Sequence, residues 1–128
     1  MKKLEHILCI DDEEDILEVA KMCLEIAGGF TVSTLNSGAE ALKQVEKIKP
    51  DLILLDVMMP IMDGPSTLKN LKKIHALIAT PIVFMTARVQ PTEIQQYLDL
   101  GANAVVPKPF DPMTLSPLIN EIWEKFHV

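Results

Sequence analysis

Short apolar runs alternate with longer amphipathic segments along the whole chain. Five of the runs are rich in Val, Ile and Leu and are bounded by polar or turn-forming residues, which indicates β-strands. They cover residues 7–10, 30–35, 52–55, 82–85 and 104–106. Strands that alternate regularly with helices favour one parallel sheet with helices on both faces.

The five intervening and final segments carry apolar residues at helical spacing. We expect the first helix to end at Gly28–Gly29, the second to begin after a Ser37 cap, and the third to reach about His75. Pro91 opens the fourth helix and Gly101 ends it. The predicted apolar faces are Ile16, Val19, Ala20, Cys23 and Ala27; Leu42, Val45 and Ile48; Leu68 and Leu71; Ile94, Tyr97 and Leu98; and Leu115, Leu118, Ile119, Ile122 and Phe126.

Two features indicate the strand order. The run 52–55 is wholly apolar, as expected of a central strand that helices cover on both faces. The run 104–106 is followed by Pro107, which cannot donate a ladder hydrogen bond and therefore belongs near an edge. Both features fit the 2-1-3-4-5 order known from other doubly wound sheets, which places the ligand-binding crevice between the first and third strands.

Composition narrows the class of protein. A chain of 128 residues that is 48% hydrophobic is expected to fold as one domain, residues 1–128. The net charge of −6 disfavours direct nucleic-acid binding, and no apolar run is long enough to span a membrane. The first residues lack a signal-peptide core, and Cys9 and Cys23 fit buried free thiols. We therefore expect a cytoplasmic protein without a membrane partner.

Polar residues follow four of the five predicted strands at the point where each strand ends. They are Asp11, Asp12, Asp56, Thr86 and Lys108. The carboxyl ends of parallel strands meet at one edge of the sheet, so these side chains are expected to lie together. Two carboxylates about 4 Å apart repel each other by roughly 4 kcal/mol at an effective dielectric constant near 20. Such crowding is typical of a functional site.

A divalent cation would relieve this repulsion. Oxygen-only ligands favour Mg²⁺, which proteins commonly hold with one or two carboxylates, waters and a phosphate group. Asp11 and Asp12 would supply most of that shell, and Asp56 and a backbone carbonyl just beyond it would complete it. Asp56 is then a candidate nucleophile toward a phosphoryl donor, with Lys108 and the Thr86 hydroxyl available to the phosphoryl oxygens.

These residues carry a resemblance to a known family. Over essentially its full length the chain resembles the receiver domain of two-component response regulators. The matching motifs are Asp11–Asp12, the run Leu55-Asp56-Val57-Met58-Met59-Pro60 with Asp63–Gly64, Thr86–Ala87, Gly101–Ala102, and Lys108-Pro109-Phe110.

The resemblance implies a flavodoxin-like fold and a phosphorelay function. Asp56 would accept a phosphoryl group from a histidine of a sensor histidine kinase or a histidine phosphotransfer protein. Mg²⁺ would bind Asp11, Asp12, Asp56 and the Met58 carbonyl, and the phosphoryl group would contact Thr86 and Lys108. The Lys108–Pro109 bond is expected to be cis.

The resemblance also implies how the phosphoryl group would be used. Phosphorylation would bias a two-state surface formed by the fourth helix, fifth strand and fifth helix, and this surface would bind a downstream protein that the sequence does not name. We expect a single receiver domain without an output domain, as a monomer or weak dimer. It would be a signalling module that takes part in its own phosphorylation and dephosphorylation, and not an enzyme with a separate substrate.

Four positions depart from the family pattern. Val105 stands where similar domains have Tyr or Phe, so the inward swing of an aromatic ring that is usual in those domains is not expected here. For this reason a receiver-like interaction domain that works without phosphorylation remains the alternative function. Met58 and Arg88 flank the path of the hydrolytic water in similar domains, and their bulk is expected to slow dephosphorylation. Pro117 predicts a short turn over 111–115 and a regular helix from about Pro117, capped by Ser116.

Overall fold

Five parallel strands form one sheet in the order β2-β1-β3-β4-β5 in this computed structural model, which describes residues 2–127. The predicted strand order is therefore confirmed, with Pro107 on an edge strand. The strands are β1 (His6–Ile10), β2 (Thr31–Leu35), β3 (Leu52–Asp56), β4 (Ile82–Thr86) and β5 (Ala104–Pro107).

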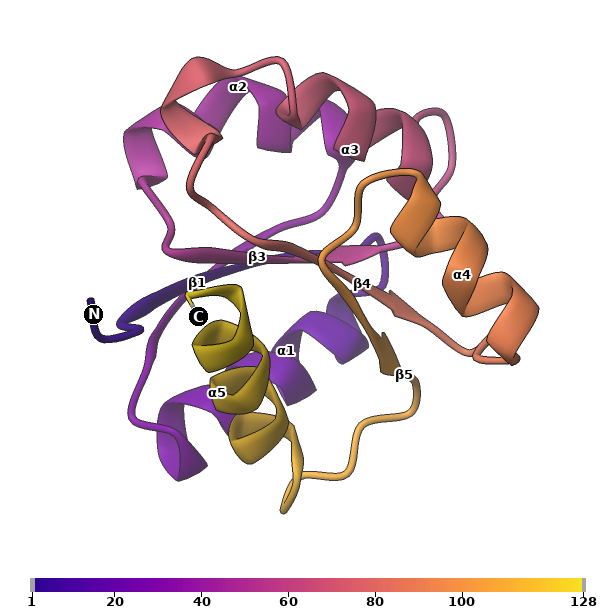
Figure 1. Ribbon diagram of the computed structural model, residues 1–128. Coiled ribbons are helices and arrows are strands. Elements are labelled where there is room, and N and C mark those ends of the chain that lie inside the picture. The colour runs from indigo at the N-terminus through magenta and orange to yellow at the C-terminus, as the bar shows by residue number, and fades with distance from the viewer. Residues whose placement is uncertain (1, 128) are drawn as a thin grey trace.

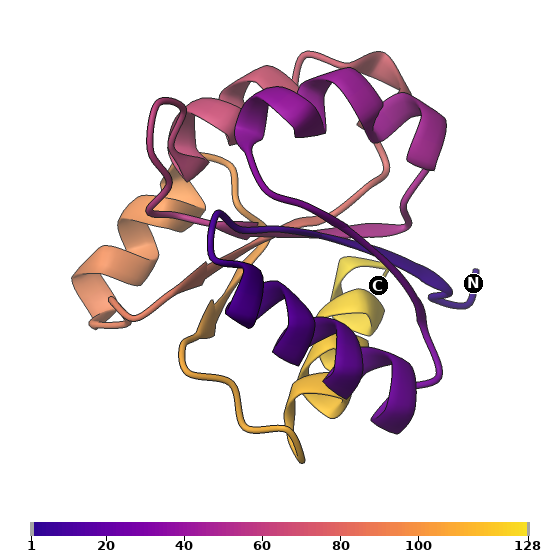
Figure 2. The ribbon, with the colours of Figure 1, turned by 180° about the vertical axis from the view of Figure 1, so that it is seen from behind.

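Helices cover both faces of the sheet (Figure 1). The views from the front and from behind agree that α1 and α5 lie on one face, whereas α2 and α3 lie on the other (Figure 2). The helices are α1 (Glu14–Met22), α2 (Gly38–Ile48), α3 (Gly64–Leu71), α4 (Pro91–Asp99) and α5 (Leu115–Phe126), with one π-helical turn η1 (Cys23–Ala27) and one 3₁₀ turn η2 (His75–Leu77).

Alternating side chains of the strands supply two separate cores. On the side of α1 and α5, Cys9, Leu54 and Met85 pack with Trp123, while on the other side Phe84 packs with the half-buried Tyr97 of α4. Every residue of β3 is buried, as expected of a strand between two layers of helices. The two cores hold the strands in register, so their carboxyl ends form one common edge.

The buried face of the first helix differs from the prediction. Val19 is 44% exposed and Ala27 is exposed, whereas Leu17 and Leu24 are buried. Apolar residues surround much of this helix, and the two larger Leu side chains take the sheet-facing positions. The π-helical turn η1 also adds residues to one turn, which displaces everything beyond Cys23 from a regular helical stripe.

The third helix is shorter than predicted. It ends at Leu71 instead of about His75, and the chain continues through the separate turn η2 before β4. The predicted beginning of the second helix is confirmed, because the Ser37 hydroxyl accepts a hydrogen bond from the Glu40 N–H at 3.1 Å.

The beginning of α5 is correct in part. The Asp111 carbonyl accepts hydrogen bonds from the Thr114 and Leu115 N–H groups, which confirms a turn there, and Pro117 lies in the first helical turn. The Ser116 cap is wrong, because Thr114 occupies the cap position. Ser116 is instead buried, and its hydroxyl donates to the Cys23 carbonyl at 3.4 Å, which links α5 to η1.

Near the amino edge of the sheet, the N-terminal residues contact both α5 and the residue before β3. The Trp123 indole N–H donates to the Lys2 carbonyl at 3.0 Å. Asp51 accepts hydrogen bonds from the Glu5 and His6 N–H groups, and its other oxygen lies 2.7 Å from the Lys2 ammonium. No helix within residues 2–127 has the length and hydropathy needed to cross a bilayer.

Candidate functional site

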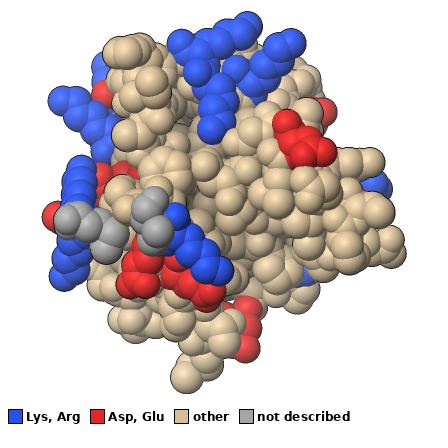
Figure 3. Space-filling model, viewed as in Figure 1, with Lys and Arg blue, Asp and Glu red and all other residues tan. Residues whose placement is uncertain are grey.

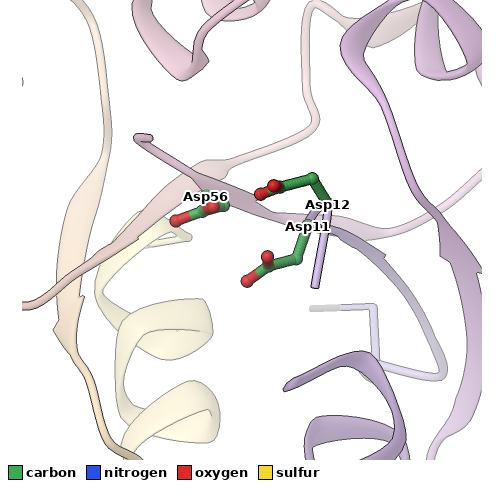
Figure 4. A group of neighbouring side chains, drawn as sticks. All are labelled: Asp11, Asp12 and Asp56. Carbon is green, nitrogen blue, oxygen red and sulfur yellow. The ribbon is translucent and has the colours of Figure 1, made fainter. Parts of the chain in front are cut away.

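Three carboxylates meet at the carboxyl edge between β1 and β3. Asp11 and Asp12 follow β1, Asp56 ends β3, and one oxygen from each lies within 4.8 Å of the others. Figure 4 shows the three side chains converging from the two strands. Asp11 and Asp56 are buried and Asp12 is exposed, so the cluster opens to solvent on one side. The predicted grouping of these residues is therefore present in the structure.

Local backbone contacts fix the two buried carboxylates. The Asp11 N–H donates to the Leu35 carbonyl, and one Asp11 carboxylate oxygen accepts from the Glu13 N–H at 2.9 Å, which turns the chain into α1. Gly64 opens α3 against the strand end, where a side chain at that position would meet the Asp56 carbonyl oxygen. The absence of a side chain therefore lets α3 begin directly beside the Asp56 backbone.

Lys108 supplies the positive charge of the cluster. Its ammonium lies 2.7 Å from an Asp11 oxygen and 3.0 Å from an Asp56 oxygen. Its backbone N–H donates to the Thr86 carbonyl at 2.9 Å, which places it directly beyond the end of β4. The Lys108–Pro109 bond is cis, as expected.

Other lysines lie away from this cluster. Figure 3 shows Lys and Arg side chains gathered over the layer of α2 and α3, which carries Lys43, Lys47 and Lys69. Among the described residues, the ion pairs that reach the acidic cluster come from Lys108 alone. The local balance is therefore three carboxylates to one ammonium, which favours an added cation.

Burial changes the ionisation of Asp56. Burial raises the pKa of its carboxyl to about 6, and the Asp11 charge acts in the same direction, against the hydrogen bond from Lys108. Burial alone would lower the pKa of Lys108, but its hydrogen bonds to Asp11 and Asp56 outweigh burial and raise the pKa above its ordinary value. Lys108 therefore stays protonated near neutral pH and stabilises the ionised form of Asp56.

Thr86 lies at the end of β4, the strand next to Asp56. Its side chain is buried, and its hydroxyl oxygen accepts a hydrogen bond from the Arg88 N–H at 3.0 Å. The hydroxyl proton remains available for another acceptor. Ala87 and Arg88, which follow, are exposed.

Two apolar residues of the loop after β3 are exposed, which the sequence pattern does not predict. Ile61, in the loop after β3, has a left-handed backbone with φ of 67° and a fully exposed side chain. Met58, two residues after Asp56, is 63% exposed. Apolar side chains are therefore exposed in the loop that follows Asp56, and only the folded loop shows that they face solvent.

The donors present fit a hard divalent cation. Carboxylate oxygens from three residues converge, and such a donor set favours a hard divalent cation over softer metals. The fold and site thus define a doubly wound α/β domain with an acidic, cation-compatible pocket at its switch point.

Comparison with known proteins identifies the family. Residues 7–120 match the response regulator receiver domain. The chain is 37% identical over 122 residues to the alkaline phosphatase synthesis transcriptional regulatory protein PhoP of Bacillus subtilis, covering 95% of this chain and 50% of that one. It is 34% identical over 125 residues to the response regulator SaeR of Staphylococcus aureus, covering 95% and 53%.

Solved structures agree with the sequence relatives. The chemotaxis response regulator CheY4 of Vibrio cholerae superposes with a TM-score of 0.86 at 30% identity, covering 94% of this chain and 99% of that one. The chain spans about half the length of the curated relatives that it matches. This chain belongs to the response regulator receiver domain family of two-component systems.

Proposed function

We propose that this receiver domain accepts a phosphoryl group on Asp56 and uses it to switch a protein-binding surface. The observation that carries the proposal is the placement of Asp56, which is buried beside two further carboxylates and hydrogen-bonded to Lys108 at 3.0 Å. A carboxylate crowded in this way destabilises the fold, and such groups cluster at functional sites.

The chemistry is a transfer between two nucleophiles. An Asp56 carboxylate oxygen forms a bond to phosphorus while the bond from phosphorus to the donor's imidazole nitrogen breaks, and that nitrogen keeps the electron pair. Lys108 stabilises the charge on the phosphoryl oxygens, and Thr86 donates its hydroxyl to one of them. Bound Mg²⁺, held by Asp11, Asp12, Asp56 and the Met58 carbonyl, would neutralise negative charge at this site.

A partner protein carrying a phosphorylated histidine fits the surface next to the site. Asp56 is buried, and the exposed Met58 and Ile61 follow it in the loop after β3, so we expect a donor to contact this loop. Met22, the last residue of α1, is 58% exposed and offers an apolar contact on the helix that follows Asp11–Asp12. Once a phosphorylated histidine protein that serves this chain is in hand, Met22→Glu should slow transfer from it more than Ile78→Glu, which alters an exposed residue near η2.

The direct test uses a small-molecule donor. The protein is incubated with acetyl phosphate, with and without Mg²⁺, and its intact mass is measured alongside that of Asp56→Asn. We expect a gain of one phosphoryl group that requires both Mg²⁺ and Asp56. A folded protein that gains no mass would favour the alternative, an interaction domain that works without phosphorylation, and a gain in Asp56→Asn would place the acceptor elsewhere.

A further inference from the structure

Helix α4 is the most weakly anchored of the five α-helices. None of its residues is buried, whereas each of α1, α2, α3 and α5 buries at least two. Ile94 and Tyr97 are half-buried, and Leu98 is 37% exposed. The position of α4 therefore depends on few side-chain contacts.

The Tyr97 ring makes the aromatic contact between α4 and the sheet. Its centroid lies 5.4 Å from that of Phe84 on β4, with the rings nearly perpendicular at 79°. Edge-to-face pairs of this kind are directional, because the positive edge of one ring faces the negative face of the other. Phe84 is fully buried, so a shift of its ring has to move Tyr97 or break the contact.

Phe84 is also a neighbour of the candidate site. Phe84 and Thr86 are two residues apart on β4, so their side chains lie on the same face of the sheet. Val105 pairs with Phe84 across β4 and β5 and contributes a short branched side chain to this face. Among the ring pairs formed within residues 2–127, Phe84–Tyr97 is the one on this face, since the others join residues of α5 and its C-terminal end.

We propose that Tyr97 is the positioning residue through which α4 responds to the state of Asp56. The inference rests on the proposed function, in which the Thr86 hydroxyl turns toward a phosphoryl group on Asp56. This rotation changes the space that the Thr86 side chain fills beside Phe84. It also competes with the hydrogen bond that the Thr86 hydroxyl accepts from the Arg88 N–H. Phe84 then repacks, and Tyr97 carries the change to α4.

The chain provides its own probe for this proposal. Tyr97 is the only tyrosine, so biosynthetic labelling with 3-fluorotyrosine gives one ¹⁹F NMR signal. The labelled full chain is treated with acetyl phosphate and Mg²⁺, and its intact mass is measured on the same sample. We expect a second ¹⁹F signal whose fraction equals the phosphorylated fraction found by mass.

The outcomes separate this inference from the function on which it rests. A gain of one phosphoryl group with an unchanged ¹⁹F signal would overturn the role of Tyr97 and leave the proposed function intact. No gain in mass would overturn the proposed function, and the inference with it. Phe84→Leu keeps a buried apolar side chain but removes the ring, so the separation of the two signals should fall at least twofold while phosphoryl uptake persists.

A second set of variants keeps the test decisive if Phe84→Leu does not fold. Hydrogen exchange of residues 91–99 is compared with and without phosphorylation in the wild type, Tyr97→Phe and Tyr97→Leu. The wild type and Tyr97→Phe should show a phosphorylation-dependent change, because both keep the ring. Tyr97→Leu should take up the phosphoryl group but lose that change, whereas an equal change in all three proteins would exclude a role for the ring.

Discussion

At the scale of one residue, the buried carboxylate of Asp56 destabilises the folded protein at neutral pH. Its raised pKa means that the folded protein holds a proton more tightly than the unfolded chain does. Folding is therefore favoured by this group at low pH, and the benefit is lost as the pH rises from about 4 through about 6. At neutral pH without a metal ion, the ionised Asp56 lowers the free energy of unfolding.

Replacing Asp56 should make the metal-free protein more stable. We expect Asp56→Asn to raise the free energy of unfolding at pH 7 by on the order of 2 kcal/mol, because the buried charge disappears while Lys108 keeps its contact with Asp11. The gain should shrink toward pH 4, where the wild-type carboxyl is protonated. Urea unfolding in the presence of EDTA at several pH values measures it. A gain that is constant between pH 4 and pH 7 would contradict the assignment.

The backbone of Ile61 is strained, and no burial of its side chain offsets the strain. A β-branched residue in the left-handed region is unfavourable, and the exposed Ile61 side chain gains nothing from burial. We expect Ile61→Asn to raise the free energy of unfolding by about 0.5–1 kcal/mol, since Asn adopts this backbone more easily. Ile78→Asn is the matched control, because Ile78 is 81% exposed and has φ of −59°. Equal effects of the two changes would show that backbone strain is not the cause.

At the scale of the elements, Asp51 joins the beginnings of two strands. It lies just before β3, and its carboxylate binds the N–H groups of Glu5 and His6 at the beginning of β1. Burial alone would raise the pKa of Asp51, but the hydrogen bonds from Lys2, His6 and Glu5 outweigh burial and hold the pKa below its ordinary value.

The stabilisation from Asp51 should depend on pH in the opposite sense to that of Asp56. A lowered pKa in the folded state gives stability above about pH 4 that is lost as the pH falls through the folded pKa. We expect Asp51→Asn to lower the free energy of unfolding by about 1 kcal/mol at pH 7 and to have little effect near pH 3. Denaturant unfolding of both proteins at the two pH values checks this. A loss of the same size at pH 3 would assign the effect to packing instead.

The elements also show what the sequence could and could not predict. The strands and the convergence of Asp11, Asp12 and Asp56 follow from local rules, since an apolar run defines each strand and parallel strands share one carboxyl edge. The order of the strands came from other doubly wound sheets, and the sequence supported it only through the apolar third strand and Pro107. The buried face of α1 and the role of Ser116 were mispredicted because both depend on contacts between distant segments, such as the bond from Ser116 to Cys23. The contact of Tyr97 with Phe84 likewise requires the folded sheet.

At the scale of the whole molecule, metal binding should offset the instability of the acidic edge. A ligand that binds only the folded state adds stability by mass action, about 1.4 kcal/mol at ten times its dissociation constant. We expect Mg²⁺ to raise the free energy of unfolding of the wild type, and to do so less in Asp12→Asn, which removes the exposed carboxylate of the cluster. Thermal or urea unfolding with Na⁺ at matched ionic strength provides the comparison. Equal stabilisation by the two salts would indicate screening alone.

The bond between the Trp123 indole and the Lys2 carbonyl has a consequence for engineering the chain. It holds the two ends of the described chain together at the amino edge, opposite the carboxylates. A short peptide linker could therefore join the ends, and a new opening at the exposed 78–79 bond would make β4 the first strand of a circular permutant. Such a permutant would keep the three carboxylates together at the carboxyl edge, although its strands would follow one another in a different order along the sequence.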